Sequence, residues 1–183
     1  VFLIPAKGGA VQQLTQGPQD HNSALEWLPD SSGLLLSINF KNNVNKPWDT
    51  DIVRLDLKTR QLTALTTQLG PDAAPKVSPD GERVAWIGHE DRPSVYHEYQ
   101  LYTAKLDGSD VRELTTANDL SVINFDWHAN NQQHYIQYDH RGRNVLSLLS
   151  KDGSVAVLSD ELSGWELDQP YVQGQFSASA GLA

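Results

Sequence analysis

The densest group of titratable side chains lies in one polar stretch near the middle of the chain. His89, Glu90, Asp91, His97 and Glu98 all fall in this stretch. Histidine and carboxylate groups suit Zn²⁺ or Mn²⁺, so a metal site is one interpretation. The other is a charged surface loop between two strands, and we favour the loop because no H-E-x-x-H or comparable spacing is present.

Two smaller polar groups allow similar alternatives. Asp49 and Asp51 follow the asparagine-rich loop Lys41–Trp48, where calcium is conceivable, but the D-x-N-x-D-G spacing is absent and an ordinary loop is favoured. Arg141 and Arg143 stand at a hairpin tip and could clamp a carboxylate. A solvated tight turn explains these two arginines as well, and we favour it.

The sequence contains no motif for nucleophilic catalysis. G-x-S-x-G is absent, and the closest string, Gly174–Gly181, fails the spacing. The chain has no cysteine, which excludes a thiolate nucleophile, a disulfide framework and a zinc–thiolate site. We therefore expect no catalytic residue, no metal ligand and no cofactor in this chain.

The charge balance narrows the classes of partner. The 183 residues include 23 acidic and 14 basic side chains, which gives a net charge of −9. A nucleic-acid binder needs a basic stripe to neutralise phosphates, and an acidic membrane attracts the same kind of surface. No apolar run approaches the roughly 20 residues that span a bilayer. We expect neither nucleic acid nor membrane as a partner.

Two independent sequence markers recur with one period, and they indicate the elements that position these residues. A Leu-Thr pair occurs at Leu14–Thr15, Leu65–Thr66 and Leu114–Thr115, with spacings of 51 and 49. Trp27, Val77 and Trp127 open a second marker, with spacings of 50 and 50. A period of 40 to 50 residues that holds four short strands is typical of a β-propeller blade.

The fold predicted is all-β, a β-propeller fragment of about three and a half four-stranded antiparallel blades. The blades expected are 1–15 (the end of one), 16–66, 67–115, 116–159 and 160–183 (the start of the next), all in one partial propeller. Strands are predicted at Ala24–Trp27, Leu34–Asn39, Asp51–Leu57, Arg83–Gly88, Tyr99–Leu106, His134–Tyr138 and Val145–Leu149.

Specific strings within the repeat resemble known propeller families. Ser78–Gly81 followed by Val84–Trp86 resembles the W-S-P-D-G-x-x-I-A-F repeat of TolB-like propellers and of the prolyl oligopeptidase family of serine peptidases. Trp86–Asp91 with Tyr99–Tyr102 and Leu106–Gly108 is similar to the acylaminoacyl-peptidase-like branch of that family. The resemblance covers nearly the whole chain, but blade motifs mark fold more than chemistry.

The resemblance implies a non-catalytic propeller portion of a serine peptidase. Such a propeller shields the active site and filters peptide substrates, and its partners are the α/β-hydrolase domain of the same parent chain and short peptides. A TolB-like protein-interaction propeller without enzymatic activity is the alternative. A propeller lyase of the oligogalacturonate type is a third, but it needs metal-binding His and Gln residues that the sequence does not assign.

The blade pattern also predicts where a site would lie. Within a blade the first-to-second and third-to-fourth connections are tight turns on one face, so the long loops Lys41–Trp48 and His89–Tyr96 lie on the opposite face. The residues expected to contact a substrate or a neighbouring domain are Trp48, His89, Arg92, Tyr96, His97 and Glu98.

The two ends of the chain are expected to be partial blades. Phe2–Leu14 reads as the third and fourth strands of one blade, and Tyr171–Phe176 reads as an innermost strand. Unpaired strand edges and exposed apolar faces invite pairing. We therefore expect self-association with Phe2–Leu14 and Tyr171–Ala183 at the contact.

Overall fold

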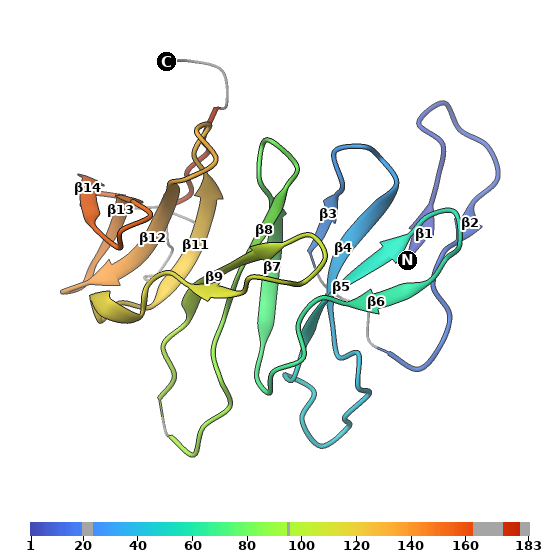
Figure 1. The fold of residues 1–183 in the computed structure, drawn as a ribbon, viewed down its shortest axis with the longest axis horizontal. Helices are drawn as coiled ribbons and strands as arrows, with labels where there is room; N and C mark the ends of the chain where they lie inside the picture. The colour runs from blue at the N-terminus through green and yellow to red at the C-terminus, as the bar shows by residue number, and fades with distance from the viewer. Residues whose placement is uncertain (20–23, 95, 163–173, 180–183) are drawn as a thin grey trace, which may run out of the picture.

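The computed structural model describes residues 1–19, 24–94, 96–162 and 174–179. In these ranges the regular structure is almost entirely β, and no helix is long and apolar enough to cross a membrane. One two-stranded and three four-stranded antiparallel sheets stand side by side (Figure 1). This arrangement confirms the all-β class and the row of propeller blades predicted from the repeat.

Each four-stranded sheet is made of consecutive strands, and we call these sheets the first, second and third blades. The first blade contains β3 (Leu25–Trp27), β4 (Gly33–Ile38), β5 (Asp51–Asp56) and β6 (Leu62–Ala64). The second contains β7 (Asp72–Val77), β8 (Arg83–Gly88), β9 (Gln100–Lys105) and β10 (Arg112–Glu113). The third contains β11 (Val122–Trp127), β12 (His134–His140), β13 (Arg143–Leu149) and β14 (Val155–Ser159), and η1 (Thr116–Asn118) precedes it. Ahead of the first blade, β1 (Phe2–Leu3) pairs with β2 (Gln12–Gln13).

The threonine of the Leu-Thr marker has one structural role in all three copies. The Thr66 hydroxyl oxygen accepts a hydrogen bond from the backbone N–H of Ile52 at 2.9 Å, and that of Thr115 accepts one from Leu101 at 3.0 Å. The Thr15 hydroxyl oxygen accepts one from the amino group of Val1 at 2.6 Å. In the first two blades this bond fixes the start of the third strand to the end of the fourth, and in the two-stranded sheet it joins the start of β1 to the residues after β2. The marker therefore recurs because each sheet uses this contact.

The tryptophan marker lies at the end of the innermost strand, as the repeat predicts. Trp127 ends β11, and its indole N–H donates to the carbonyl of Lys76 on β7 at 3.0 Å. Lys76 in turn donates to the carbonyl of Phe125 at 2.7 Å. These contacts join the inner strands of two neighbouring blades. Trp27 ends β3 of the first blade and is 50% exposed. The sheet that precedes this blade has two described strands, β1 and β2.

The hydrophobic core consists of layers between adjacent sheets. One layer, which includes Leu35 and Ile52 of the first blade with Trp86 of the second, fills the first interface. Another, which includes Leu101 of the second blade and Phe125 of the third, fills the next. Strands covered on both faces therefore read as continuous apolar runs, because only neighbouring blades can bury both faces of such a small sheet.

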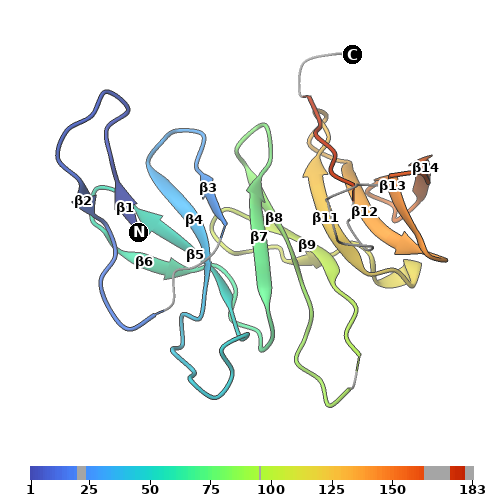
Figure 2. The same ribbon diagram turned by 180° about the vertical axis from the view of Figure 1, so that it is seen from behind.

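Turns and long loops lie on opposite faces of this row. The turns from β3 to β4 and from β7 to β8 are at the top of Figure 1, whereas loops 39–50 and 89–99 are at the bottom. Figure 2 shows the same separation from behind. Of the predicted innermost strand 171–176, residues 171–173 lie outside the described ranges. Gly174 is not in a strand, and its carbonyl accepts a hydrogen bond from the Gln137 side chain at 2.5 Å.

Candidate functional site

The first of the two long loops is shaped by one amide side chain. Asn39 directly follows β4 and is buried. Its Nδ2 donates to the carbonyls of Asn43 and Lys46 at 3.0 and 3.2 Å, and its Oδ1 accepts from the backbone N–H of Asn43 at 2.9 Å. These bonds add to the backbone hydrogen bonds within the loop, such as Lys46 N–H to the Asn43 carbonyl at 3.1 Å. Loop 39–50 therefore has a defined shape on the long-loop face.

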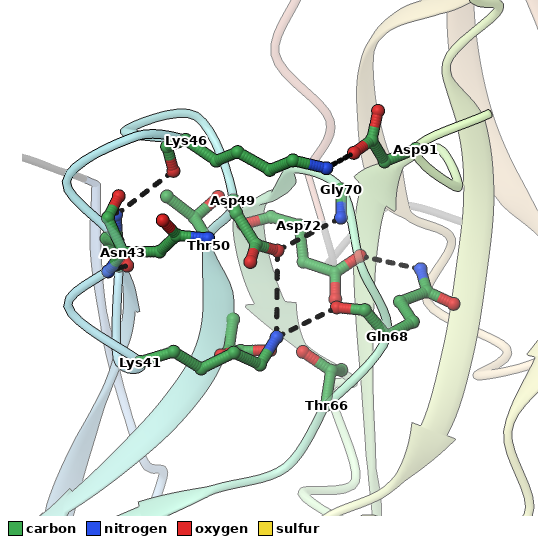
Figure 3. A network of polar contacts seen from close by, with 12 residues as sticks. Lys41, Asn43, Lys46, Asp49, Thr50, Thr66, Gln68, Gly70, Asp72 and Asp91 are labelled. Carbon is green, nitrogen blue, oxygen red and sulfur yellow. Dashed lines mark hydrogen bonds and ion pairs between the residues drawn. The ribbon is translucent and has the colours of Figure 1, made fainter. Parts of the chain in front are cut away.

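One lysine of this loop binds to acidic groups and to the linker between two blades. Lys41 Nζ donates to Asp51 Oδ1 at 3.1 Å. It also lies 3.6 Å from Asp49 Oδ1 (Figure 3). It also donates to the backbone carbonyl of Gln68 at 3.0 Å. Asp49 Oδ1 accepts from the backbone N–H of Gly70 at 3.0 Å. The loop of the first blade is thus attached to the linker that enters the second blade.

Asp72 is the deepest acidic residue of this network. Its Oδ1 accepts hydrogen bonds from Trp86 Nε1 at 2.9 Å and from Gln68 Nε2 at 3.0 Å, and its side chain is fully buried. Burial raises the pKa of Asp72 to about 6 despite these donors, because a desolvated carboxylate is disfavoured. Burial also raises the pKa of Asp51. The network holds more carboxyl groups than cations. Because its pKa is raised to about 6, Asp72 takes up a proton at a higher pH than an ordinary aspartate does.

The second long loop is fixed to the first by an ion pair, and it meets the linker between the first and second blades at a close backbone approach. Lys46 of loop 39–50 pairs with Asp91 of loop 89–99, and this contact with Lys46 lowers the pKa of Asp91 (Figure 3). The backbone of Gly70 has φ +124°, and a Cβ placed there would be 2.0 Å from the carbonyl oxygen of His89. Only glycine fits this position, because the strand-to-loop transition at His89 leaves no room for a side chain.

A pocket of about 470 Å³ opens beside loop 89–99, and we call it the loop pocket. The loop itself and the outer strands β9 and β10 supply its walls. It is lined by His89, Glu90, Arg92, Ser94, Tyr96, His97, Glu98, Gln100, Tyr102, Glu113 and Thr116. The volume lies in the range of about 300 to 1,000 Å³ that is usual for small-molecule and peptide-residue sites.

Stacked rings and one ion pair order the side chains of the loop pocket. The His89 and His97 rings stack with centroids 4.3 Å apart, and Tyr99 meets His89 edge-on at 4.9 Å. Arg92 donates from Nε and Nη2 to Glu90 Oε2 at 2.9 and 2.7 Å. Glu98 and Glu113 add two further carboxylates. With neutral histidines the pocket therefore carries net negative charge.

The structure brings together most of the residues expected at the site. His89, Arg92, Tyr96, His97 and Glu98 all line the loop pocket. Trp48 does not line it, but lies at the end of loop 39–50 and is 53% exposed.

The strand residues of the pocket were missed by sequence reasoning. Gln100 and Tyr102 alternate along β9, and Glu113 pairs with Tyr102 across the sheet. Burial raises the pKa of Tyr102, which keeps its phenol neutral. The period-two alternation of β9 carried a signal, since residues 100 and 102 share one face of that strand.

Three of the other polar residues singled out in the sequence, Arg143, Asp49 and Asp51, have local partners. Arg143 pairs with Asp160 at 2.7 Å at the end of a two-residue turn. Asp49 and Asp51 bind Lys41, as described above. Within the described ranges, no three His, Cys, Asp or Glu side chains are grouped so that they could hold a metal ion.

Comparisons with known proteins identify the fold and not the family. No protein-family model matches the chain, and no curated protein matches it. Among solved structures, TolB from Acinetobacter baumannii superposes with a TM-score of 0.64 at 21% identity over 87% of this chain and 37% of its own. An oligogalacturonate lyase in complex with manganese gives 0.62 at 16% identity over 82% of this chain and 45% of its own. The acylaminoacyl peptidase of Pyrococcus horikoshii gives 0.61 at 13% identity over 88% and 28%.

These three neighbours have different names and share one architecture. At such identities a likeness shows the fold alone, because one propeller scaffold carries many unrelated functions. The chain spans less than half the length of each of the three. It is similar to part of a β-propeller.

Proposed function

We propose that this chain is a non-catalytic β-propeller portion of a serine peptidase of the acylaminoacyl-peptidase or prolyl-oligopeptidase type. In this role it shields the active site and admits short peptides to it. The observation that carries the proposal is the loop pocket. It lies on the long-loop face, it has the volume of a peptide-residue site, and it is lined by most of the side chains that the blade pattern led us to expect at the site.

The charges of the loop pocket favour one kind of peptide. Glu90, Glu98 and Glu113 supply three carboxylates, and Arg92 is paired with the first of them. A positively charged group, such as a free amino terminus or a lysine side chain, complements this surface. The stacked His89 and His97 rings and the Tyr96 side chain offer flat faces for an apolar neighbour.

A TolB-like protein-interaction propeller without enzymatic activity is the second candidate. The observation that favours it is a set of exposed apolar side chains on the two long loops. Val44 is 81% exposed and Tyr96 is 70% exposed, and Trp48 lies nearby in sequence to Val44. Exposed aromatic residues on one face are typical of a protein-binding surface. A folded partner rather than a short peptide would then cover the long-loop face.

A peptide titration tests the role of the loop pocket. We expect the amide Lys-Ala-Ala-NH₂ to bind the chain and to shift the NMR signals of the His89 and His97 rings. The variant Glu98→Gln/Glu113→Gln should weaken binding by about fivefold, because each lost carboxylate removes a modest surface attraction. The matched control Glu161→Gln removes one exposed carboxylate outside the pocket and should leave binding unchanged. Absence of any shift at millimolar peptide would contradict the peptide role and favour the interaction propeller.

Two further observations test the peptidase context. The purified chain should react with no fluorophosphonate probe, because it lacks a G-x-S-x-G elbow. Stoichiometric labelling of any serine would overturn its non-catalytic assignment. In the parent gene, a G-x-S-x-G elbow followed by Asp and His is expected within about 300 residues downstream, the size of one hydrolase domain. A stop codon soon after Ala183 would contradict the peptidase proposal.

A further inference from the structure

One core position of the repeat changes its chemical character in the third blade. The residue that pairs with the marker at the end of the innermost strand is Leu34 in the first blade and Val84 in the second. In the third blade the equivalent residue is His134, which pairs with Trp127. All three are buried, and His134 is only 4% exposed. A histidine thus occupies a site where the same sheet elsewhere holds an aliphatic side chain.

The His134 ring is incompletely satisfied by its surroundings. Its Nε2 is buried and makes no hydrogen bond to any described residue. The Trp127 ring lies against it, with centroids 4.2 Å apart. Burial, reinforced by the nearby charge of Arg83, lowers the pKa of His134 to about 4, so the ring is neutral at pH 7. An unpaired buried polar atom destabilises a fold by about 1 to 3 kcal/mol, so its presence calls for a reason.

A small pocket of about 190 Å³ lies between the second and third blades beside this histidine, and we call it the blade pocket. It is on the side of the tight turns, away from the loop pocket. Its lining includes Arg83, Arg112, Leu114, Trp127, His134 and Lys151. Three cations therefore surround it in a chain whose net charge is −9.

Some of the donor groups on these cations have no partner among the described residues. The Asp110 carboxylate accepts hydrogen bonds from Arg83 Nη1 at 2.9 Å and from Arg112 Nε at 2.9 Å. These contacts lower the pKa of Asp110. The Nη atoms of Arg112 and the ammonium group of Lys151 make no hydrogen bond or ion pair to a described residue. Two donor groups thus remain available beside a neutral imidazole. With Asp110 counted, the pocket keeps an excess of two positive charges.

The walls of the blade pocket add size and polarity limits. Leu114 and Trp127 provide an apolar side, and the volume equals that of roughly six water molecules at about 30 Å³ each. This is less than the usual volume of a drug-sized site, so one end group of a ligand fits and an extended ligand does not. Guanidinium, ammonium and imidazole N–H groups together suit a carboxylate.

We propose that the blade pocket binds a small carboxylate that carries an apolar group, with Arg112, Lys151 and His134 as its hydrogen-bond donors. The site does not depend on the proposed role of the long-loop face, since it lies at the other face and uses other residues. Two sources present this chemistry: a free organic acid, and the carboxyl terminus of a peptide that ends in an apolar residue.

A pair of matched ligands tests the charge requirement on the unmodified chain. We expect N-acetylphenylalanine to bind in calorimetric titration and N-acetylphenylalaninamide to bind at least tenfold more weakly, because only the first carries a carboxylate. NMR titration of His134 adds a local readout. Saturation with the acid should raise the pKa of His134 by one unit or more, since a bound anion offsets part of the effect of Arg83. Equal binding of acid and amide, or a His134 signal unmoved by the acid, would overturn the proposal.

Variants and peptides complete the test. Arg112→Gln should weaken binding of the acid about tenfold. His134→Leu should also weaken it, and this variant places in the third blade the residue type found in the first. The control Arg92→Gln, in the loop pocket, should have no effect. Unchanged affinity in both blade-pocket variants would contradict the assignment. The peptide Ala-Ala-Phe and its carboxyl-terminal amide separate the sources. Stronger binding of Ala-Ala-Phe than of the free acid assigns a peptide terminus, and binding of the free acid alone assigns a small organic acid.

Discussion

The loop pocket and the blade pocket show two ways in which a repeat protein acquires a site. The loop pocket is about 470 Å³, carries negative charge and is made largely of loop residues added to the blade pattern. The blade pocket is about 190 Å³, carries positive charge and arises where the blade pattern itself changes, at His134. The first kind is found by looking at insertions. The second is found only by comparing equivalent positions among blades.

The same comparison separates the contributions to stability. The loop pocket depends on a close backbone approach and on an ion pair between loops, and these residues are not members of the hydrophobic layers between blades. The blade pocket lies inside such a layer and contains a polar atom that has no hydrogen-bond partner among the described residues, so it weakens the core around it. Functional positions often break the local rules that hold elsewhere in a fold.

The largest effect is expected from Gly70→Ala in the long-loop region. A Cβ there would lie 2.0 Å from the His89 carbonyl oxygen, and φ is +124°. We expect the free energy of unfolding to fall by about 4 kcal/mol, because clash and backbone strain add. In the control Gly142→Ala, φ is +77° and no atom of the described part of the chain lies within 4 Å of the added Cβ, so the substitution should cost only about 1 kcal/mol. Urea denaturation measures both, and equal losses would contradict the role of Gly70.

A second prediction uses the two buried titratable groups, Asp72 and His134, whose effects on stability have opposite signs. The pKa of His134 is about 4 against 6.5 for an ordinary histidine, so the unfolded chain binds more protons and stability falls as the pH falls from 6.5 to 4. The pKa of Asp72 is about 6 against 3.8, so the folded chain binds more protons and stability rises as the pH falls from 6 to 4. Each contribution is about 3 kcal/mol.

Single variants separate these two contributions. Asp72→Asn leaves the His134 contribution unopposed, so its stability should decline steeply from pH 6.5 to 4. His134→Leu leaves the Asp72 contribution, so its stability should hold or rise over the same range relative to the other variant. Urea titrations at several pH values measure both curves, and parallel curves would show that burial does not shift these groups as described.

The third prediction concerns the stability of His134→Leu at pH 7. Leucine stands at the equivalent position of the first blade. The substitution therefore removes a buried nitrogen that no described residue pairs with, and it keeps an established packing arrangement. We expect the free energy of unfolding to rise by about 1 kcal/mol. Ser147→Leu, at another buried polar site of the same blade, serves as control and should destabilise by overpacking. Loss of stability in His134→Leu would mean that the histidine is a structural residue.

The smallest effect is expected where the two long loops meet. Lys46→Gln breaks the partly exposed ion pair with Asp91. The unfolding midpoint should not change measurably, since such pairs contribute little. Affinity of the loop pocket for a cationic peptide should fall by about two- to fivefold as loop 89–99 loses one fixed contact. A loss larger than that of the Glu98→Gln/Glu113→Gln variant would place the ligand at the ion pair rather than in the pocket.

Much of the fold was predictable from the sequence because its markers have direct structural causes. The spacing of the Leu-Thr pairs reflects the hydroxyl contact that Thr66 and Thr115 make with a third strand, and the predicted strands differ from the observed ones by at most two residues at either end. The long-loop face was predictable for the same reason, since tight turns leave the loops on the other side.

The contacts between blades were not predictable in the same way. Lys41 reaches Gln68, and Trp127 reaches Lys76, across an interface that no local pattern describes. The character of His134 was also missed. Its strand was predicted, but its burial between two blades depends on which strand face meets the neighbour, and a single histidine in a strand gives no such information.

Two small probes of opposite charge and the same aromatic ring test the difference between the pockets most directly. Phenylalaninamide carries an ammonium group, and N-acetylphenylalanine carries a carboxylate. In NMR spectra of the imidazole groups, the cation should shift His89 and His97 and leave His134 unchanged, whereas the anion should shift His134 and leave the other two unchanged. If both probes move the same histidines, or the anion moves only the loop pocket, the two sites do not differ in charge preference and the assignment of the blade pocket is wrong.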